Sequence, residues 1–98
     1  MNIIGKPKIE AFCSKNDQAR SALDRWFELT EEAEWRHLAD IRKTFSHCDK
    51  VGSCYVFNVA GNKYRLIANV QFQASLVVVR RILTHAEYDL DKWKIECD

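Results

Sequence analysis

Two arginines, a histidine and a tyrosine in the C-terminal half of the chain are the side chains best suited to chemistry: Arg65, Arg80, His85 and Tyr88. A neutral imidazole can remove the proton from a ribose 2′-hydroxyl, and the alkoxide can then attack the adjacent phosphate. Arginines would stabilise the charge on the phosphorane, and an acid would protonate the leaving oxygen. Together, the four side chains would suit RNA cleavage without a metal ion. Each also has an ordinary interpretation, as a solvated arginine, a surface histidine or a core tyrosine ring.

A strand predicted over residues 63–72 must position the first arginine. Its even-numbered residues are mostly apolar and should pack on helices, because side chains alternate between the two faces of a strand. The opposite face then carries Lys63, Arg65 and Asn69. We expect Lys63 and Asn69 to contact RNA beside Arg65.

The turn that precedes this strand sets its register. A two-residue hairpin loop at 61–62 would place Arg65 opposite Asn58, so that both side chains share the open face. Asn62 is better explained by the geometry of this turn than by chemistry, since asparagine accepts a positive φ.

The turn that follows the strand decides where the second arginine lies. If it closes as four residues, 73–76, Asn69 lies opposite Arg80, and Arg80 joins the open face. Arg81 would then point into or beside the helical layer, with its charged head reaching solvent. A slip of one residue would separate these side chains.

A helix start after the last strand positions the histidine. Thr84 and Glu87 form a Thr-x-x-Glu capping box, which predicts a short C-terminal helix running through Tyr88 and Trp93. His85 opens this helix, and the positive end of the helix dipole disfavours a protonated imidazole there. We therefore expect the neutral, base form of His85, with Tyr88 on the same side of the helix.

The first half of the chain predicts a short strand over residues 2–4 and three helices. Pro7 suits the first turn of a short helix that runs through Cys13, and Asn16 or Asp17 can cap a longer second helix. Apolar residues recur at three- and four-residue steps in the second and third helices, which predicts buried stripes. These stripes comprise Ala19, Ala22, Leu23, Trp26, Phe27 and Leu29, and then Trp35, Leu38, Ile41 and Phe45.

From Cys54 onward the period changes to two, and strands are predicted at 54–59, 63–72 and 76–83. The order of strand, helices, three-stranded meander and short helix indicates an α+β fold. Helices should pack on one face of a small antiparallel sheet. With 98 residues, the chain is expected to form a single domain, 1–98.

The chain is nearly neutral, with a formal net charge of +1, but its charge is segregated. Residues 50–81 carry five cations and no acid, which suggests a focused anion site. Chance clustering in a strand-rich segment is the alternative, since strands are poor in acids. No apolar run is long enough for a membrane span, and the N-terminus has no apolar region typical of a signal peptide. We therefore expect a cytoplasmic protein.

The four cysteines are interpreted as reduced thiols, because the sequence carries no secretion signal. A zinc site made of His47, Cys48, Cys54 and Cys97 is an alternative. It lacks the CxxC or HxxxH spacing that zinc sites usually show.

Two stretches of the sequence resemble the signature of the HigB-type toxin family. The first is Val-Phe-Asn at 56–58, then Gly-Asn at 61–62 and a Tyr-Arg pair at 64–65. The second is Val-Arg at 79–80, followed by Thr-His-x-Glu-Tyr-Asp at 84–89. The resemblance extends over the whole chain, because the helical N-terminal half and the total length also fit.

The resemblance implies a RelE-like fold with the RNA site on the open face of the sheet. It also implies a ribosome-dependent mRNA endonuclease that needs no metal and no cofactor, held inactive by a HigA-type helix-turn-helix antitoxin. DNA would be contacted only through that antitoxin. The residues that match the family pattern are Asn58, Asn62, Arg65, Arg80, His85, Tyr88 and Asp89. Asp89 would orient His85 or brace the helix, and Arg81 lies outside the shared pattern.

Two other functions fit the same scaffold. A relative that inhibits DNA gyrase would need no histidine at the site, so the motif around His85 argues against it. A non-catalytic module that only binds the antitoxin would differ in having lost cleavage.

Overall fold

A five-stranded sheet forms the centre of the computed structural model, which describes residues 1–97. Its strands follow the order β1-β5-β4-β3-β2. They are β1 (Asn2–Ile4), β2 (Cys48–Val51), β3 (Cys54–Val59), β4 (Tyr64–Gln71) and β5 (Leu76–Thr84). The predicted meander of β3, β4 and β5 is confirmed, and β2 extends it in antiparallel fashion.

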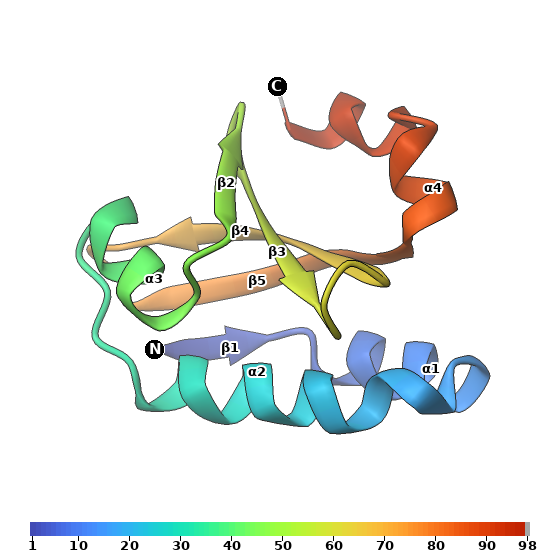
Figure 1. Cartoon of the computed structure of the whole chain (residues 1–98). Helices are drawn as coiled ribbons and strands as arrows, with labels where there is room; N and C mark the ends of the chain where they lie inside the picture. Colours follow the sequence, from blue (N-terminus) through green and yellow to red (C-terminus); the bar gives the residue numbers. More distant parts are fainter. Residues whose placement is uncertain (98) are drawn as a thin grey trace.

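The α+β class is confirmed, although the sheet is mixed and not purely antiparallel. Strand β1 pairs with β5 in parallel. Parallel pairing needs a long connection, and here the chain passes through the helical half of the protein before it returns to the sheet (Figure 1).

Helices α1 (Lys6–Lys15) and α2 (Arg20–Glu32) lie together on one side of the sheet, and α3 (Leu38–Thr44) follows at the sheet end (Figure 1). The main core lies between them and the apolar face of β3, β4 and β5, as the alternation predicts. Its buried members include Ile9, Leu23, Trp26, Ile41, Phe57, Leu66 and Val79. No helix within residues 1–97 has the length and apolar character needed to cross a membrane.

One predicted helix start holds in position and another is wrong. Helical structure begins at Asp17, as the 3-10 helix η1 (Asp17–Ala19) that leads into α2, but the side chain of Asn16 forms no N-cap bond and instead donates to the carbonyl of Phe12 at the end of α1. The third helix begins only at Leu38, so Trp35 lies in an irregular segment before it. Trp35 is nevertheless buried, at 3% exposed, and its Nε1 donates to Thr44 Oγ1. At Trp35 the apolar spacing therefore predicted the burial of the side chain correctly and its helical backbone incorrectly.

The turn after β4 changes which arginine lies on the open face. Asn69 pairs with Val78, and not with Arg80, because the turn closes one residue earlier than expected. A β-bulge then leaves Arg80 without a partner, since Ala68 pairs with Val79 and Ile67 pairs with Arg81. The bulge places Arg81 on the side of the sheet that carries Arg65, so the predicted positions of Arg80 and Arg81 are both wrong.

The other side of the sheet is partly covered by the C-terminal segment (Figure 1). Helix α4 (His85–Asp89) is short, and the 3-10 helix η2 (Lys92–Cys97) follows it. The predicted helix through Trp93 thus stops early, at a backbone reversal where Asp91 has a φ of 60°. A second, smaller core forms under this segment from Cys54, Val56, Ile67, Trp93 and Cys97.

Cys54 and Cys97 form a disulfide, which corrects the prediction of four reduced thiols. The fold brings their Cα atoms to 5.1 Å, within the usual range for such a bond, although 43 residues separate them in sequence. Cys13 and Cys48 are free and buried. The alternative zinc set is not formed, because two of its three thiols are bonded to each other. Within residues 1–97 no group of three or more His, Cys, Asp or Glu side chains is placed to hold a metal ion.

Candidate active site

Arg65 is a buried cation at the end of the β3–β4 hairpin. It lies opposite Asn58, as predicted, and is only 8% exposed. The positive φ expected of Asn62 in the turn between them is wrong, since the left-handed residues there are Ala60 and Gly61. Its Nη1 donates to the carbonyls of Asn62 and Tyr64, both at 3.1 Å. No carboxylate within residues 1–97 forms an ion pair with it. Two carbonyl dipoles fix the side chain and leave its charge uncompensated, which is what an anion site requires.

Tyr88 forms the second wall of this site. The guanidinium carbon of Arg65 lies 5.1 Å from the centre of its ring, a cation–π contact. The Tyr88 ring is also in contact with Trp93, whose ring stacks at 5.0 Å between centroids. The arginine and the tyrosine are therefore held together, as the shared signature implied.

His85 is joined to Asp89 across one turn of α4. The Nδ1 atom of His85 lies 3.0 Å from Asp89 Oδ2, and the His85 side chain is 51% exposed. In a neutral imidazole, a proton on Nδ1 that is shared with Asp89 leaves Nε2 as the nitrogen with the lone pair. Asp89 thus makes the contact expected of a residue that orients His85.

The start of α4 is fixed to the hairpin that carries Arg65. Thr84 and Glu87 form both bonds of the predicted capping box. The backbone N–H of His85 also donates to the carbonyl of Lys63, at 3.0 Å. This backbone bond brings the histidine to the same end of the sheet as the arginine.

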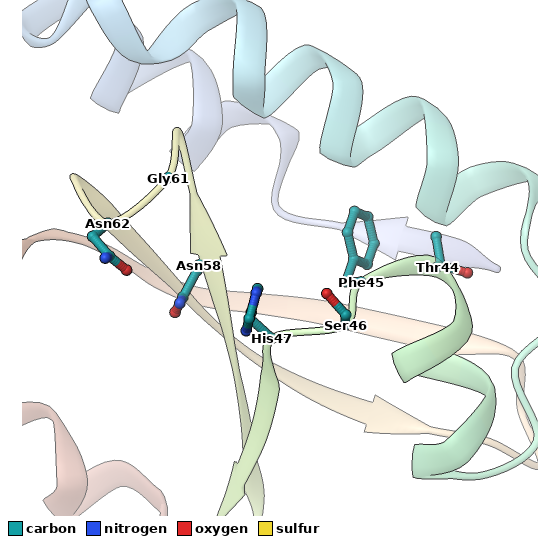
Figure 2. A pocket seen from close by; sticks show the side chains of 7 residues that line it. All are labelled: Thr44, Phe45, Ser46, His47, Asn58, Gly61 and Asn62. Atoms are coloured by element: carbon teal, nitrogen blue, oxygen red, sulfur yellow. The ribbon is translucent and has the colours of Figure 1, made fainter.

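A cavity of about 490 Å³ opens at this end of the sheet, between the β3–β4 turn and the chain that leaves α3. Figure 2 shows His47, Asn58 and Asn62 among the side chains that line it. The lining has no acid and no lysine or arginine. Sequence reasoning missed His47, because nothing in its neighbourhood predicts that the loop before β2 meets the hairpin turn. A polar, aromatic cavity without strong charge suits a nucleobase better than a phosphate.

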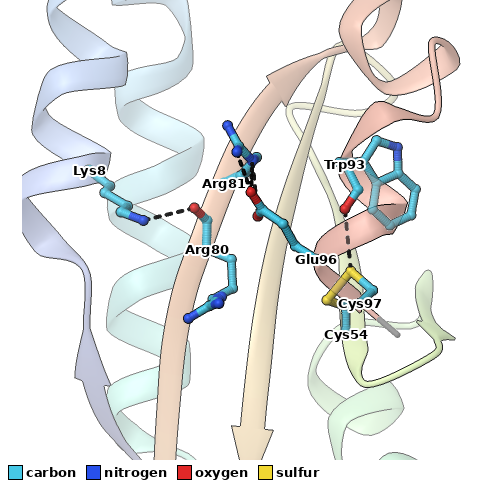
Figure 3. A network of polar contacts seen from close by, with 7 residues as sticks. All are labelled: Lys8, Cys54, Arg80, Arg81, Trp93, Glu96 and Cys97. Carbon is cyan, nitrogen blue, oxygen red and sulfur yellow. Dashed lines mark hydrogen bonds and ion pairs between the residues drawn. A yellow bond between two sulfur atoms is a disulfide. The ribbon is translucent and has the colours of Figure 1, made fainter.

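Three predicted site residues lie outside this cluster: Arg80, which was expected to be catalytic, and Asn69 and Arg81, which were expected to contact RNA. Arg81 forms an ion pair with Glu96, and its hydrogen bond lowers the pKa of that carboxyl (Figure 3). Arg80 sits at the bulge next to α1, where Lys8 donates to its carbonyl oxygen at 2.9 Å. Asn69 donates to the carbonyl of Ser53 at 2.9 Å. The structure therefore brings Asn58, Asn62, Lys63, Arg65, His85, Tyr88 and Asp89 to one end of the sheet, and it leaves Asn69, Arg80 and Arg81 away from it.

This arrangement has the parts needed for proton transfer at a phosphate. Arg65 can bind the phosphate, His85 can exchange a proton, and the phenol of Tyr88 is a second proton donor. The three come from two elements, strand β4 and helix α4, that the capping box and the Lys63 carbonyl hold together.

The family model and the similar proteins found by comparison point to the same family. A family described as "HigB_toxin, RelE-like toxic component of a toxin-antitoxin system" matches residues 19–91, which include every residue of the cluster. A protein named mRNA interferase HigB from Escherichia coli O6:H1 is 30% identical over 92 residues, covering 91% of this chain and 89% of that protein. The mRNA interferase toxin HigB of Escherichia coli K12 is 44% identical over 45 residues, which are 46% of this chain and 40% of that protein. An mRNA interferase HigB from Shigella flexneri matches to the same extent.

Proposed function

The chain belongs to the HigB family of RelE-like toxins of toxin–antitoxin systems, and on this premise we propose that it cleaves mRNA on the ribosome without a metal ion. One observation carries the proposal. Arg65 is buried, forms no ion pair within residues 1–97 and lies against Tyr88, at the end of the sheet where His85 is paired with Asp89. A buried cation kept free of carboxylates is suited to a phosphate that gains charge in the transition state.

The proposed reaction uses the ribose of the substrate as the nucleophile. Nε2 of His85 takes the proton of the 2′-hydroxyl, and the 2′ oxygen forms a bond to the adjacent phosphorus. Arg65 stabilises the additional negative charge on the phosphate oxygens. The bond from phosphorus to the 5′ oxygen then breaks, and Tyr88 protonates that oxygen. The products are a 2′,3′-cyclic phosphate and a 5′-hydroxyl end.

We propose that the cavity lined by His47, Asn58 and Asn62 holds the base of a nucleotide next to the cleaved bond. The amides of Asn58 and Asn62 offer both donors and acceptors to a base edge, and the His47 ring offers a stacking surface. This gives Asn58 and Asn62 a role in RNA binding in addition to their place in the hairpin. Lys63, which is exposed and follows the same turn, would contact the RNA phosphates.

We propose dependence on the ribosome because the site offers few cations. Affinity for free RNA grows with the number of phosphates that a protein neutralises. Of the site residues named within 1–97, two are lysine or arginine, Lys63 and Arg65, and the whole chain has a net charge of +1. Such a site binds free mRNA weakly, so the ribosome would have to present the strand. The natural inhibitor would be a HigA-type helix-turn-helix antitoxin, since membership of a toxin–antitoxin family implies an antitoxin partner.

The test is induced expression of the chain in bacteria, with and without the protein encoded by the adjacent gene. We expect growth arrest that the second protein relieves, and new mRNA 5′ ends within translated regions. His85→Gln should abolish the arrest. His37→Gln is its control and should still arrest growth, because His37 is exposed and lies in the helical half of the chain. Intact mRNA in arrested cells, together with altered DNA supercoiling, would replace this proposal by gyrase inhibition. Normal growth with abundant folded protein would leave a non-catalytic binding module.

Metal independence has its own measurement. Cleavage on purified ribosomes should persist when a chelator selective for transition metals is added while magnesium is kept for the ribosome. Loss of cleavage that added zinc restores would contradict the metal-free mechanism.

A further inference from the structure

The C-terminal segment is connected to the proposed site through a continuous chain of contacts. Cys97 is bonded to Cys54 of β3, and its sulfur lies 3.7 Å from the carbonyl oxygen of Trp93 (Figure 3). Trp93 is 3% exposed, stacks on Tyr88 and donates from Nε1 to the Tyr88 carbonyl at 3.0 Å. Tyr88 in turn lies against Arg65. Disulfide, tryptophan, tyrosine and arginine are thus in contact one after another.

Helix α4 cannot hold Tyr88 in place without help. It has five residues, His85–Asp89, none of which is buried. A helix this short is unstable by itself in water, so its position depends on tertiary contacts. The capping box secures its first turn, and Trp93 supplies the contact at the other end.

Besides the packing of Trp93 in the smaller core, three contacts hold its segment against the sheet. The first is the ion pair of Arg81 and Glu96, whose side chains are 51% and 34% exposed. Pairs this exposed hold a segment weakly. The second is the hydrogen bond that the backbone N–H of Ser53 donates to the Cys97 carbonyl, next to Gly52, where a Cβ atom would overlap that oxygen. The third is the disulfide, which is covalent and almost fully buried.

We infer that Trp93 is a positioning residue for the Arg65–Tyr88 pair and that the Cys54–Cys97 disulfide holds it there, so that cleavage depends on the oxidation state of these two cysteines. This inference rests on the proposed function for its effect on cleavage, but the positioning itself is a property of the fold. Trp93 and Cys97 lie outside the residues matched by the family, 19–91, so membership alone does not imply this device.

The redox step is a thiol–disulfide exchange. A dithiol reductant gives two electrons and two protons to the Cys54–Cys97 bond, which becomes two thiols, and the reductant becomes a cyclic disulfide. The other two cysteines do not interfere. Burial raises the pKa of Cys48 to about 12 and raises the pKa of Cys13, so both stay protonated and poorly reactive.

The experiment compares the oxidised protein, the protein reduced with dithiothreitol, and three variants: Trp93→Leu, Trp93→Phe and the double variant Cys54→Ser/Cys97→Ser. Cys13→Ser is the matched control, because Cys13 is a buried cysteine that takes no part in the disulfide. Single-turnover cleavage of mRNA on the ribosome gives the rate, with ribosome affinity measured separately. The ¹H–¹⁵N spectrum reports the indole N–H of Trp93 and the Nε–H of Arg65.

We expect reduction and the double cysteine variant to lower the rate about 10- to 100-fold without weakening ribosome binding, because catalysis is sensitive to small displacements. Trp93→Leu should lower the cleavage rate to a similar extent. Trp93→Phe should keep most of the wild-type rate, because the phenylalanine ring can still stack on Tyr88. The Trp93 and Arg65 signals should shift on reduction, and Cys13→Ser should match the wild type in every measurement.

Two results would overturn the inference. One is an oxidised protein that does cleave mRNA, but no faster than its reduced form and its Trp93→Leu variant. The other is a pair of Trp93 and Arg65 signals that reduction leaves unchanged, a result that counts whether or not the chain cleaves RNA. An oxidised protein that never cleaves mRNA, yet shows the spectral shifts, would instead count against the proposed function alone.

Discussion

The guanidinium of Arg65 lies over the ring of Tyr88, at 5.1 Å from its centre, and joins strand β4 to helix α4. Two backbone carbonyls of the hairpin fix the other side of the arginine. Arg65 is the one buried charged side chain of residues 1–97, and the contact places it beside the phenol of Tyr88. The short helix that carries Tyr88 also carries His85 and Asp89.

Arg65→Lys should lower the rate of cleavage about 100-fold or more. Lysine keeps the positive charge but lacks the planar fork that binds two carbonyls, a ring face and a phosphate together. The side chain is 8% exposed, so some loss of stability is also expected and should be measured by chemical denaturation. Arg80→Lys is the matched control, since Arg80 is exposed at the bulge, and it should change the rate less than about threefold. Equal loss in both variants would show that the Arg80 guanidinium is needed as much as that of Arg65, and would contradict the assignment of the phosphate site to the buried Arg65.

His85→Gln should slow cleavage by about 10²–10⁴, the usual effect of removing a general acid or base. Asp89→Asn should have a smaller effect, because it disturbs the orientation of the imidazole and leaves its nitrogen in place. In the double variant, the effect of Asp89→Asn should vanish, since an orienting residue has nothing to orient once the histidine is gone. Single-turnover rates for the four proteins measure this coupling. Fully additive losses would separate Asp89 from His85.

His47→Ala should weaken the binding of substrate or alter base preference without abolishing chemistry. The physical reason is its place in the cavity beside Asn58 and Asn62, away from the Arg65–Tyr88 contact. Loss of one stacked base costs roughly 1–3 kcal/mol. Cleavage-site mapping on a set of mRNAs, with His37→Ala as control, measures the effect. An unchanged cleavage pattern would remove the cavity from the RNA site.

Reduction of the Cys54–Cys97 disulfide should lower the free energy of unfolding by about 2–4 kcal/mol, given that the bond closes a loop across 43 residues. Urea unfolding with and without dithiothreitol measures it, and Cys54→Ser/Cys97→Ser should be insensitive to the reductant. If reduction left the unfolding midpoint of the wild type unchanged, the bond would not constrain the fold.

Local signals in the sequence predicted the site wherever its geometry is local. The Asn58–Arg65 register follows from a hairpin turn, and the start of α4 follows from a capping box of four residues. The exchange of Arg80 and Arg81 was not predictable, because a bulge in β5 depends on how the whole sheet pairs. The disulfide was missed for a related reason, since only tertiary folding brings Cys54 and Cys97 together. His47 lies in the loop before β2, and no periodic pattern in the sequence predicts the path of that loop toward the hairpin turn.

Single-turnover cleavage on ribosomes tests the central claim most directly. Purified oxidised wild type and His85→Gln would be added to ribosomes that hold a defined mRNA, and new 5′ ends would be read by primer extension. We predict discrete ends within the translated region that carry a 5′-hydroxyl, produced by the wild type and not by His85→Gln over the same time. Intact mRNA with the wild type, or the same ends formed at the same rate by His85→Gln, would contradict the account.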